Sequence, residues 1–173
     1  MELKYPHDNF RSKSNILISK YCPDISLINS KLESNNGNTP LILSLLCNDI
    51  KSFSELLSFG ASPDIPNNSG ESPLHISITK GNIDFLIILL KNNVNCNVQN
   101  KDGNTPLHLA VEKKEINMIR ILLKNGSDTN IKNNLGYTPT HLAIKNKLNE
   151  SIMKLFKEKK GDIYNIKDSF NKT

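Results

Sequence analysis

The sequence predicts an all-α solenoid, in which short helix–turn–helix units stack side by side and hairpin-like loops join them. One pattern recurs every 33 residues, starting at Gly37, Gly70, Gly103 and Gly136. Each unit holds two short segments with apolar residues at helical spacing, separated by a polar turn. One helix pair cannot bury its apolar face alone, so neighbouring units must stack into a continuous core.

The first helix of each unit is predicted by a Thr-Pro or Ser-Pro dipeptide. A Thr or Ser side chain can cap a helix, and Pro suits the first helical position because its missing N–H would be unpaired there anyway. The segment PLHLAVEKK, which starts at Pro106, is an example. The prolines that keep this register are Pro40, Pro73, Pro106 and Pro139.

The second helix follows a polar turn such as KGN at 80–82. INMIRILLKN, which starts at Ile116, has apolar residues at helical spacing. A glycine such as Gly60 or Gly126 can then end the helix with a positive φ. The Asn- and Gly-rich segment that follows predicts a turn or hairpin leading into the next unit. The chain contains no Trp, so we expect an aliphatic core.

These signals divide the chain into six parts. We expect a partial, degenerate N-terminal repeat and cap at 1–36, four repeats at 37–69, 70–102, 103–135 and 136–168, and a C-terminal tail at 169–173. Terminal units of a stack are irregular because one side faces water. We expect Ile16, Leu17 and Ile18 to cover one edge, and NESIMKLFKEKK, which starts at Asn149, to cover the other.

The segment TPLH carries a family resemblance. Thr105–His108 matches the hallmark of the ankyrin repeat completely, Ser72–His75 has Ser for Thr, and Thr138–His141 has Thr140 for Leu. The segment Thr39–Ile42 lacks the His. From residue 37 to about 168 the sequence resembles the ankyrin repeat family, which implies a helical solenoid that binds proteins without catalysis.

Three of the four histidines, His75, His108 and His141, lie 33 residues apart. Equivalent residues in stacked helices are about 8–10 Å apart, whereas a zinc–nitrogen bond is about 2.0–2.1 Å long. One metal ion therefore cannot join two of them. The resemblance implies that each His hydrogen-bonds the nearby Thr and loop backbone, so we expect a structural role.

The sequence gives no sign of catalytic, metal or cofactor-binding sites. It lacks the phosphate-loop, dinucleotide-binding, nucleophile-elbow and zinc-protease motifs. Cys22, Cys47 and Cys96 lie far apart, as expected for free thiols in a reducing compartment. The polar start and the short apolar runs predict neither a signal peptide nor a membrane span. We expect a monomer in the cytoplasm, or in a host cytoplasm or nucleus.

Partners of the family usually meet the hairpin tips and the exposed side of the first helices, which face the concave surface. Mapped by register, the candidate partner-binding residues are Leu46, Cys47, Pro66, Asn68, Glu71, Lys80, Gln99, Lys101, Asn104, Glu112, Lys113, Lys132, Asn134, Leu135, Tyr137, Lys145 and Asn146. Leu135 and Tyr137 stand out because Tyr is enriched at binding hot spots. Leu46 and Cys47 are similar candidates, and for both pairs the alternative of packing between neighbouring units stays open.

The predicted function is binding of a protein partner. The short chain resembles the small inhibitor-of-NF-kappa-B-like ankyrin proteins of some viruses, which suggests an inhibitor or adaptor directed at a host regulator in a virus or parasite. An alternative is a nucleic-acid-associated regulator, since eight Lys and four acidic residues follow Gly136. No aromatic stacking platform accompanies these lysines, so we do not expect nucleic acid as the partner. A third possibility is a scaffold subunit of a larger assembly.

Overall fold

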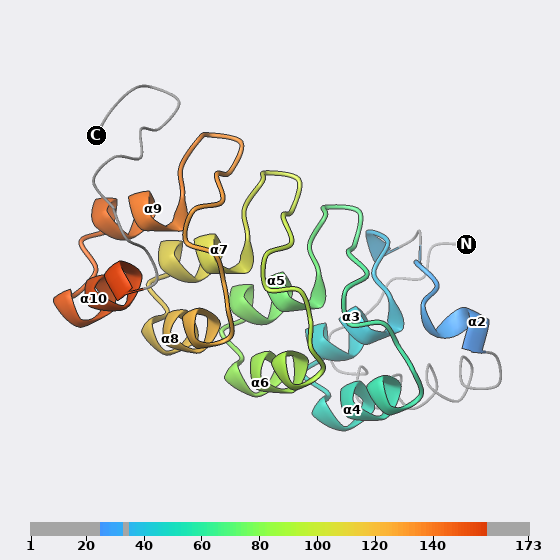
Figure 1. Ribbon diagram of the computed structural model, residues 1–173. Helices are drawn as coiled ribbons and strands as arrows, with labels where there is room; N and C mark the ends of the chain where they lie inside the picture. The colour runs from blue at the N-terminus through green and yellow to red at the C-terminus, as the bar shows by residue number, and fades with distance from the viewer. Residues whose placement is uncertain (1–24, 33–34, 159–173) are drawn as a thin grey trace.

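The computed structural model describes residues 25–32 and 35–158, and within them the fold is a row of stacked helix pairs (Figure 1). A short helix α2, Ile25–Ile28, comes first. The inner helices are α3 Pro40–Leu46, α5 Pro73–Thr79, α7 Pro106–Glu112 and α9 Pro139–Lys145. The outer helices are α4 Ile50–Ser58, α6 Ile83–Lys91, α8 Ile116–Lys124 and α10 Glu150–Glu158. The predicted all-α solenoid is confirmed.

The inner helices form one layer, the outer helices a second, and the connecting loops project beyond the inner helices (Figure 1). Each inner helix packs against the next, α3 on α5, α5 on α7 and α7 on α9. Within the described residues the loops form turns, and the one isolated bridge joins Leu32 to Asn38. Ile16, Leu17, Ile18 and the tail at 169–173 lie outside the described residues.

The predicted capping of the inner helices is confirmed. The hydroxyl oxygens of Thr39, Ser72, Thr105 and Thr138 accept hydrogen bonds from the backbone N–H three residues on, at 3.2–3.5 Å. Each capping residue is extended and a proline opens the helix behind it. Each cap thereby provides an acceptor for one of the four N–H groups at the start of the helix that have no partner within the helix.

Two of the repeated histidines bond the nearby hydroxyl residue and loop backbone, as the resemblance implied, and in doing so they join one unit to the next. His108 Nδ1 accepts from the Thr105 backbone N–H at 3.0 Å and lies 2.8 Å from Thr105 Oγ1. Its Nε2 lies 3.0 Å from the carbonyl oxygen of Tyr137 in the following loop. His75 makes the same contacts with Ser72 and with the carbonyl of Asn104, at 2.9 Å from its Nε2. A carbonyl can only accept, so Nε2 carries the proton in both rings.

The core is mainly Leu and Ile, as the expected aliphatic core requires, but it also contains three aromatic side chains that this expectation left out. Phe53, Phe85 and Phe156 are among the largest fully buried side chains. The rings of Phe53 in α4 and Phe85 in α6 meet edge to face, with centroids 4.8 Å apart. Each lies on an outer helix, where a large side chain fills the space between stacked units.

The C-terminal helix α10 packs on α8 and α9 and buries Ile152 and Phe156. It is therefore the outer helix of the last pair. Ile144 of α9 stays 49% exposed, whereas its equivalents one and two units earlier, Val111 and Ile78, are completely buried. We expected the segment from Asn149 to cover this edge of the stack. Within the described residues, it covers the outer layer and leaves Ile144 of the inner layer exposed.

The two bridging histidines predict how stability depends on pH. Burial lowers the pKa of both His75 and His108 from its usual value near 6.5. Because the pKa is lower in the folded state, the unfolded chain binds protons at a higher pH than the folded chain does as the pH falls. The contribution of both rings is therefore fully present above about pH 6.5 and is lost as the pH falls below it.

Urea unfolding at several pH values checks this. The free energy of unfolding should fall between pH 7 and pH 5. A variant with both His75→Gln and His108→Gln should be less stable at pH 7 and should show a weaker dependence over the same range. If the variant and the wild type lose stability in parallel, these rings are not the titrating groups.

A pair of glycine substitutions tests the close approach of neighbouring loops. Gly103 has a φ of 74°, and a Cβ there would lie 2.7 Å from the backbone nitrogen of Asn134 in the next loop. Gly126 has a φ of 88°, and a Cβ there would meet nothing within 4 Å. Gly126→Ala should cost about 1–2 kcal/mol through backbone strain, and Gly103→Ala about 1–3 kcal/mol more through the clash. Equal losses in urea unfolding would show that the loops can separate without cost.

Candidate partner-binding surface

The loops present three hairpin tips, residues 66–71, 99–104 and 132–137, along one side of the stack (Figure 1). An asparagine holds each tip. The Asn133 Oδ1 accepts from the backbone N–H groups of Leu135 and Tyr137 at 3.1 and 3.0 Å. Asn67 and Asn100 make the equivalent bonds in the other tips. We missed these three residues in the sequence, although their 33-residue spacing is a signal for a repeated role.

The tips are also joined to one another. The backbone N–H of Lys101 donates to the carbonyl of Ser69 at 3.2 Å, and that of Asn134 donates to the carbonyl of Asp102 at 3.0 Å. The side chain of Asn134 adds a bond to the carbonyl of Lys101 at 2.8 Å. The backbone of the 99–104 tip is thus held from both sides, and that of the 132–137 tip is held by its preceding neighbour.

Leu135 and Tyr137, which the sequence singled out together, differ in their surroundings. Leu135 is 62% exposed, more than any other large apolar side chain in the described part of the chain. Tyr137 is half-buried. Its ring lies 5.2 Å from the Lys145 ammonium and meets the His141 ring edge on, with centroids 6.4 Å apart. Tyr137 therefore packs partly on the inner helix of its own unit.

The remaining tip candidates fall into two groups. Pro66, Asn68, Lys101 and Lys132 are exposed. Several others already hold the fold together. Gln99 Nε2 donates to the carbonyls of Gly103 and Lys132 at 2.7 and 3.0 Å. Asn104 Oδ1 accepts from Asn133 at 2.8 Å, and Glu71 Oε2 accepts from Asn67 at 3.2 Å.

A second row of candidates lies where each inner helix turns into its outer helix. We call residues 46–49, 79–82, 112–115 and 145–148 the inner-helix turn row. The candidates Leu46, Lys80, Glu112, Lys113 and Lys145 are exposed there. The structure brings them into equivalent positions of stacked units, at the opposite end of the inner helices from the tips (Figure 1).

Cys47 and Asn146 of the same row are only half-exposed. Asn146 Nδ2 donates to the carbonyl of Val111 at 3.2 Å, which ties α9 to α7. Burial, together with the Asp49 carboxylate, raises the pKa of the Cys47 thiol. A raised pKa keeps the sulfur protonated, which does not suit a nucleophile or metal ligand.

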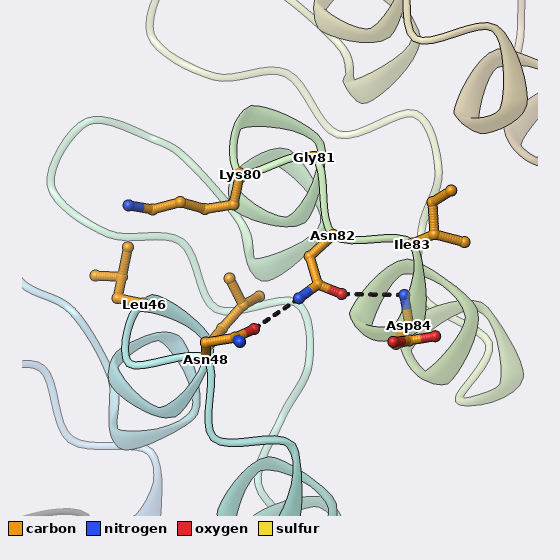
Figure 2. Close-up of a pocket in the computed structure, with 8 residues that line it drawn as sticks. Leu46, Asn48, Lys80, Gly81, Asn82, Ile83 and Asp84 are labelled. Atoms are coloured by element: carbon orange, nitrogen blue, oxygen red, sulfur yellow. Dashed lines mark hydrogen bonds between the residues drawn. The ribbon is translucent and has the colours of Figure 1, made fainter. Parts of the chain in front are cut away.

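The first two units of the row enclose a groove of about 480 Å³. It is lined by Leu45, Leu46, Asn48, Lys80, Gly81, Asn82, Ile83 and Asp84 (Figure 2). Asn82 Nδ2 donates to Asn48 Oδ1 at 2.7 Å across it, and Asn82 Oδ1 accepts from the Asp84 backbone N–H at 3.1 Å (Figure 2). The groove thus combines an apolar side with fixed polar groups.

Among the described residues, every helix is too short or too polar to cross a bilayer. In the same described residues, no group of three or more His, Cys, Asp or Glu side chains is placed so that it could hold a metal ion.

Comparison with known families agrees with the geometry. The family model for ankyrin repeats in three copies matches residues 87–168, the model for ankyrin repeats in many copies matches 56–110, and the model for a single ankyrin repeat matches 36–68. A search among curated proteins found no match. The three models together cover residues 36–168, a stretch that includes the stacked helix pairs between Pro40 and Glu158, and the chain belongs to the ankyrin repeat family.

Proposed function

We propose that the chain is a non-catalytic module that binds a protein partner through the hairpin tips and the inner-helix turn row. Ankyrin repeats are generic protein-interaction modules and are typically non-catalytic. The observation that carries the proposal is Leu135, a large apolar side chain that is 62% exposed on a tip whose backbone is fixed by hydrogen bonds.

A fixed backbone favours binding because the partner does not have to order it. Association always costs translational and rotational freedom, and loop ordering would add to that cost. Here the Asn133 side chain and the neighbouring tip hold the loop before any partner arrives. The exposed apolar area of Leu135 can then contribute to affinity directly.

We propose a regulatory role for this binding. A monomer of four repeats, 37–69, 70–102, 103–135 and 136–168, acts as an inhibitor or adaptor against a host regulator. That role rests on the resemblance of the repeats to small viral ankyrin proteins. The competing role is nucleic-acid binding, which the exposed Lys154 and Lys157 on α10 would serve.

An affinity pull-down from native or host cell lysate tests the proposal, with Leu135→Ala as the probe. Phe59→Ala is the matched control, since Phe59 is 54% exposed but follows the outer helix α4. The wild type and the control should retain one protein, and Leu135→Ala should retain about tenfold less, which corresponds to a loss of about 1.4 kcal/mol.

Two outcomes would overturn this assignment. Equal retention by Leu135→Ala and wild type would show that the tip does not contact the partner. Capture of nucleic acid alone, lost steeply as salt is raised, would favour phosphate binding instead. Circular dichroism and urea unfolding of each variant establish that it is folded before the comparison.

A further inference from the structure

The inner-helix turn row carries exposed positive charge. Its lysines are Lys80, Lys113, Lys114, Lys145 and Lys147, and all are exposed. Its acidic residues are Asp49, Glu112 and Glu115. The Asp49 carboxylate already accepts hydrogen bonds from the backbone N–H and the hydroxyl of Ser52 at 3.0 and 2.6 Å. With five lysines against three carboxylates the row carries a net positive charge, and the groove beside it adds the exposed carboxylate of Asp84.

The groove at the first two units gives this row an apolar end. Leu46 lies on one side of it, and Figure 2 shows the Lys80 side chain extending toward that side. Leu46 is 38% exposed although it is the last residue of α3. At the equivalent position the other units have Thr79, Glu112 and Lys145. The apolar surface is thus specific to this end of the row.

A short side chain, Asn82, follows the turn at this groove. It bonds to Asn48 in the preceding unit and to the start of α6. The equivalent residue one unit later is Glu115, whose Oε1 lies 3.8 Å from where a Cβ on Gly81 would be. In the last unit it is Leu148, which is buried. The groove between the first two units is therefore lined by a shorter side chain than the equivalent positions of the two later units carry.

From this arrangement we infer that the row binds an acidic, extended segment of the protein partner, with one aliphatic side chain in the groove. The aliphatic side chain contacts Leu46 and Ile83, and a neighbouring carboxylate pairs with Lys80. The segment then continues along the row toward Lys113 and Lys145. This inference rests on the proposed function and names the kind of partner that the row recognises.

The distance between equivalent lysines of the row sets the spacing of acidic residues in the bound segment. Equivalent positions of stacked helices lie about 8–10 Å apart, and an extended segment in the polyproline II conformation advances about 3.1 Å per residue and turns every third side chain to the same side. Acidic residues should therefore recur about every third position after the aliphatic one. Single exposed ion pairs contribute little, about 0–1 kcal/mol, so the aliphatic anchor and several carboxylates are needed together.

Selection from a displayed library of random peptides of about twelve residues, long enough to span three steps of the row, tests this on the full chain. Enriched peptides should share an aliphatic residue followed by acidic residues about three apart. Leu46→Ser and Lys80→Glu should each weaken a selected synthetic peptide about tenfold or more. Both side chains are exposed, so both variants should fold. Lys51→Glu is the matched control, because Lys51 is exposed on the outer helix α4.

Three results would overturn the inference. One is a selection that yields no enriched peptide, or only peptides without acidic residues. A second is binding of the selected peptides to Leu46→Ser and Lys80→Glu that is as tight as binding to wild type. A third is displacement of these peptides by a single-stranded RNA of mixed sequence in proportion to its phosphate charge. If Leu135→Ala still abolishes capture of a protein partner in any of these cases, the chain remains a binding module and only the role of this row is wrong.

Discussion

The structure depends on a hydrogen bond from a buried, neutral imidazole to the carbonyl of the next loop. The Nε2 of His75 reaches Asn104, and that of His108 reaches Tyr137. The other nitrogen of each ring accepts the backbone N–H of the residue that caps the same helix. One side chain therefore fixes the start of a helix and the position of the following unit. A protonated ring would place an N–H against an N–H donor, so the arrangement requires the neutral form.

The same constraint shapes the proposed binding surface. Asparagine side chains, imidazoles and neighbouring hairpins hold the tips, so their backbone is fixed while some of their side chains face outward. Leu135 is an example, since its backbone N–H is bound by Asn133 while its side chain is exposed. Polar residues such as Gln99 and Asn104 are different, because their side chains bond to neighbouring loops. Position on a tip alone therefore does not separate a contact residue from a structural one.

Much of the fold could be predicted from the sequence, because each helix has local signals. Thr105 and Pro106 begin an inner helix, and Gly126 follows the end of an outer helix with positive φ, as expected. The hydrogen bonds of the histidines to the nearby Thr and to loop backbone were expected from the family resemblance, and the structure adds that the bonded loop belongs to the next unit. The buried Phe53 and Phe85 were missed because composition alone does not show that their rings meet between adjacent units. The groove could not be predicted, since it lies between residues of two units whose relative placement only the folded structure shows.

The central claim is that neutral imidazoles with the proton on Nε2 join the units. Long-range nitrogen–proton NMR correlation of the histidine rings at pH 7 tests it most directly. The account predicts that His75 and His108 are neutral, protonated at Nε2, and remain so as the pH is lowered past the range where an exposed histidine titrates. A proton on Nδ1, or a charged ring at pH 7, in either residue would contradict it.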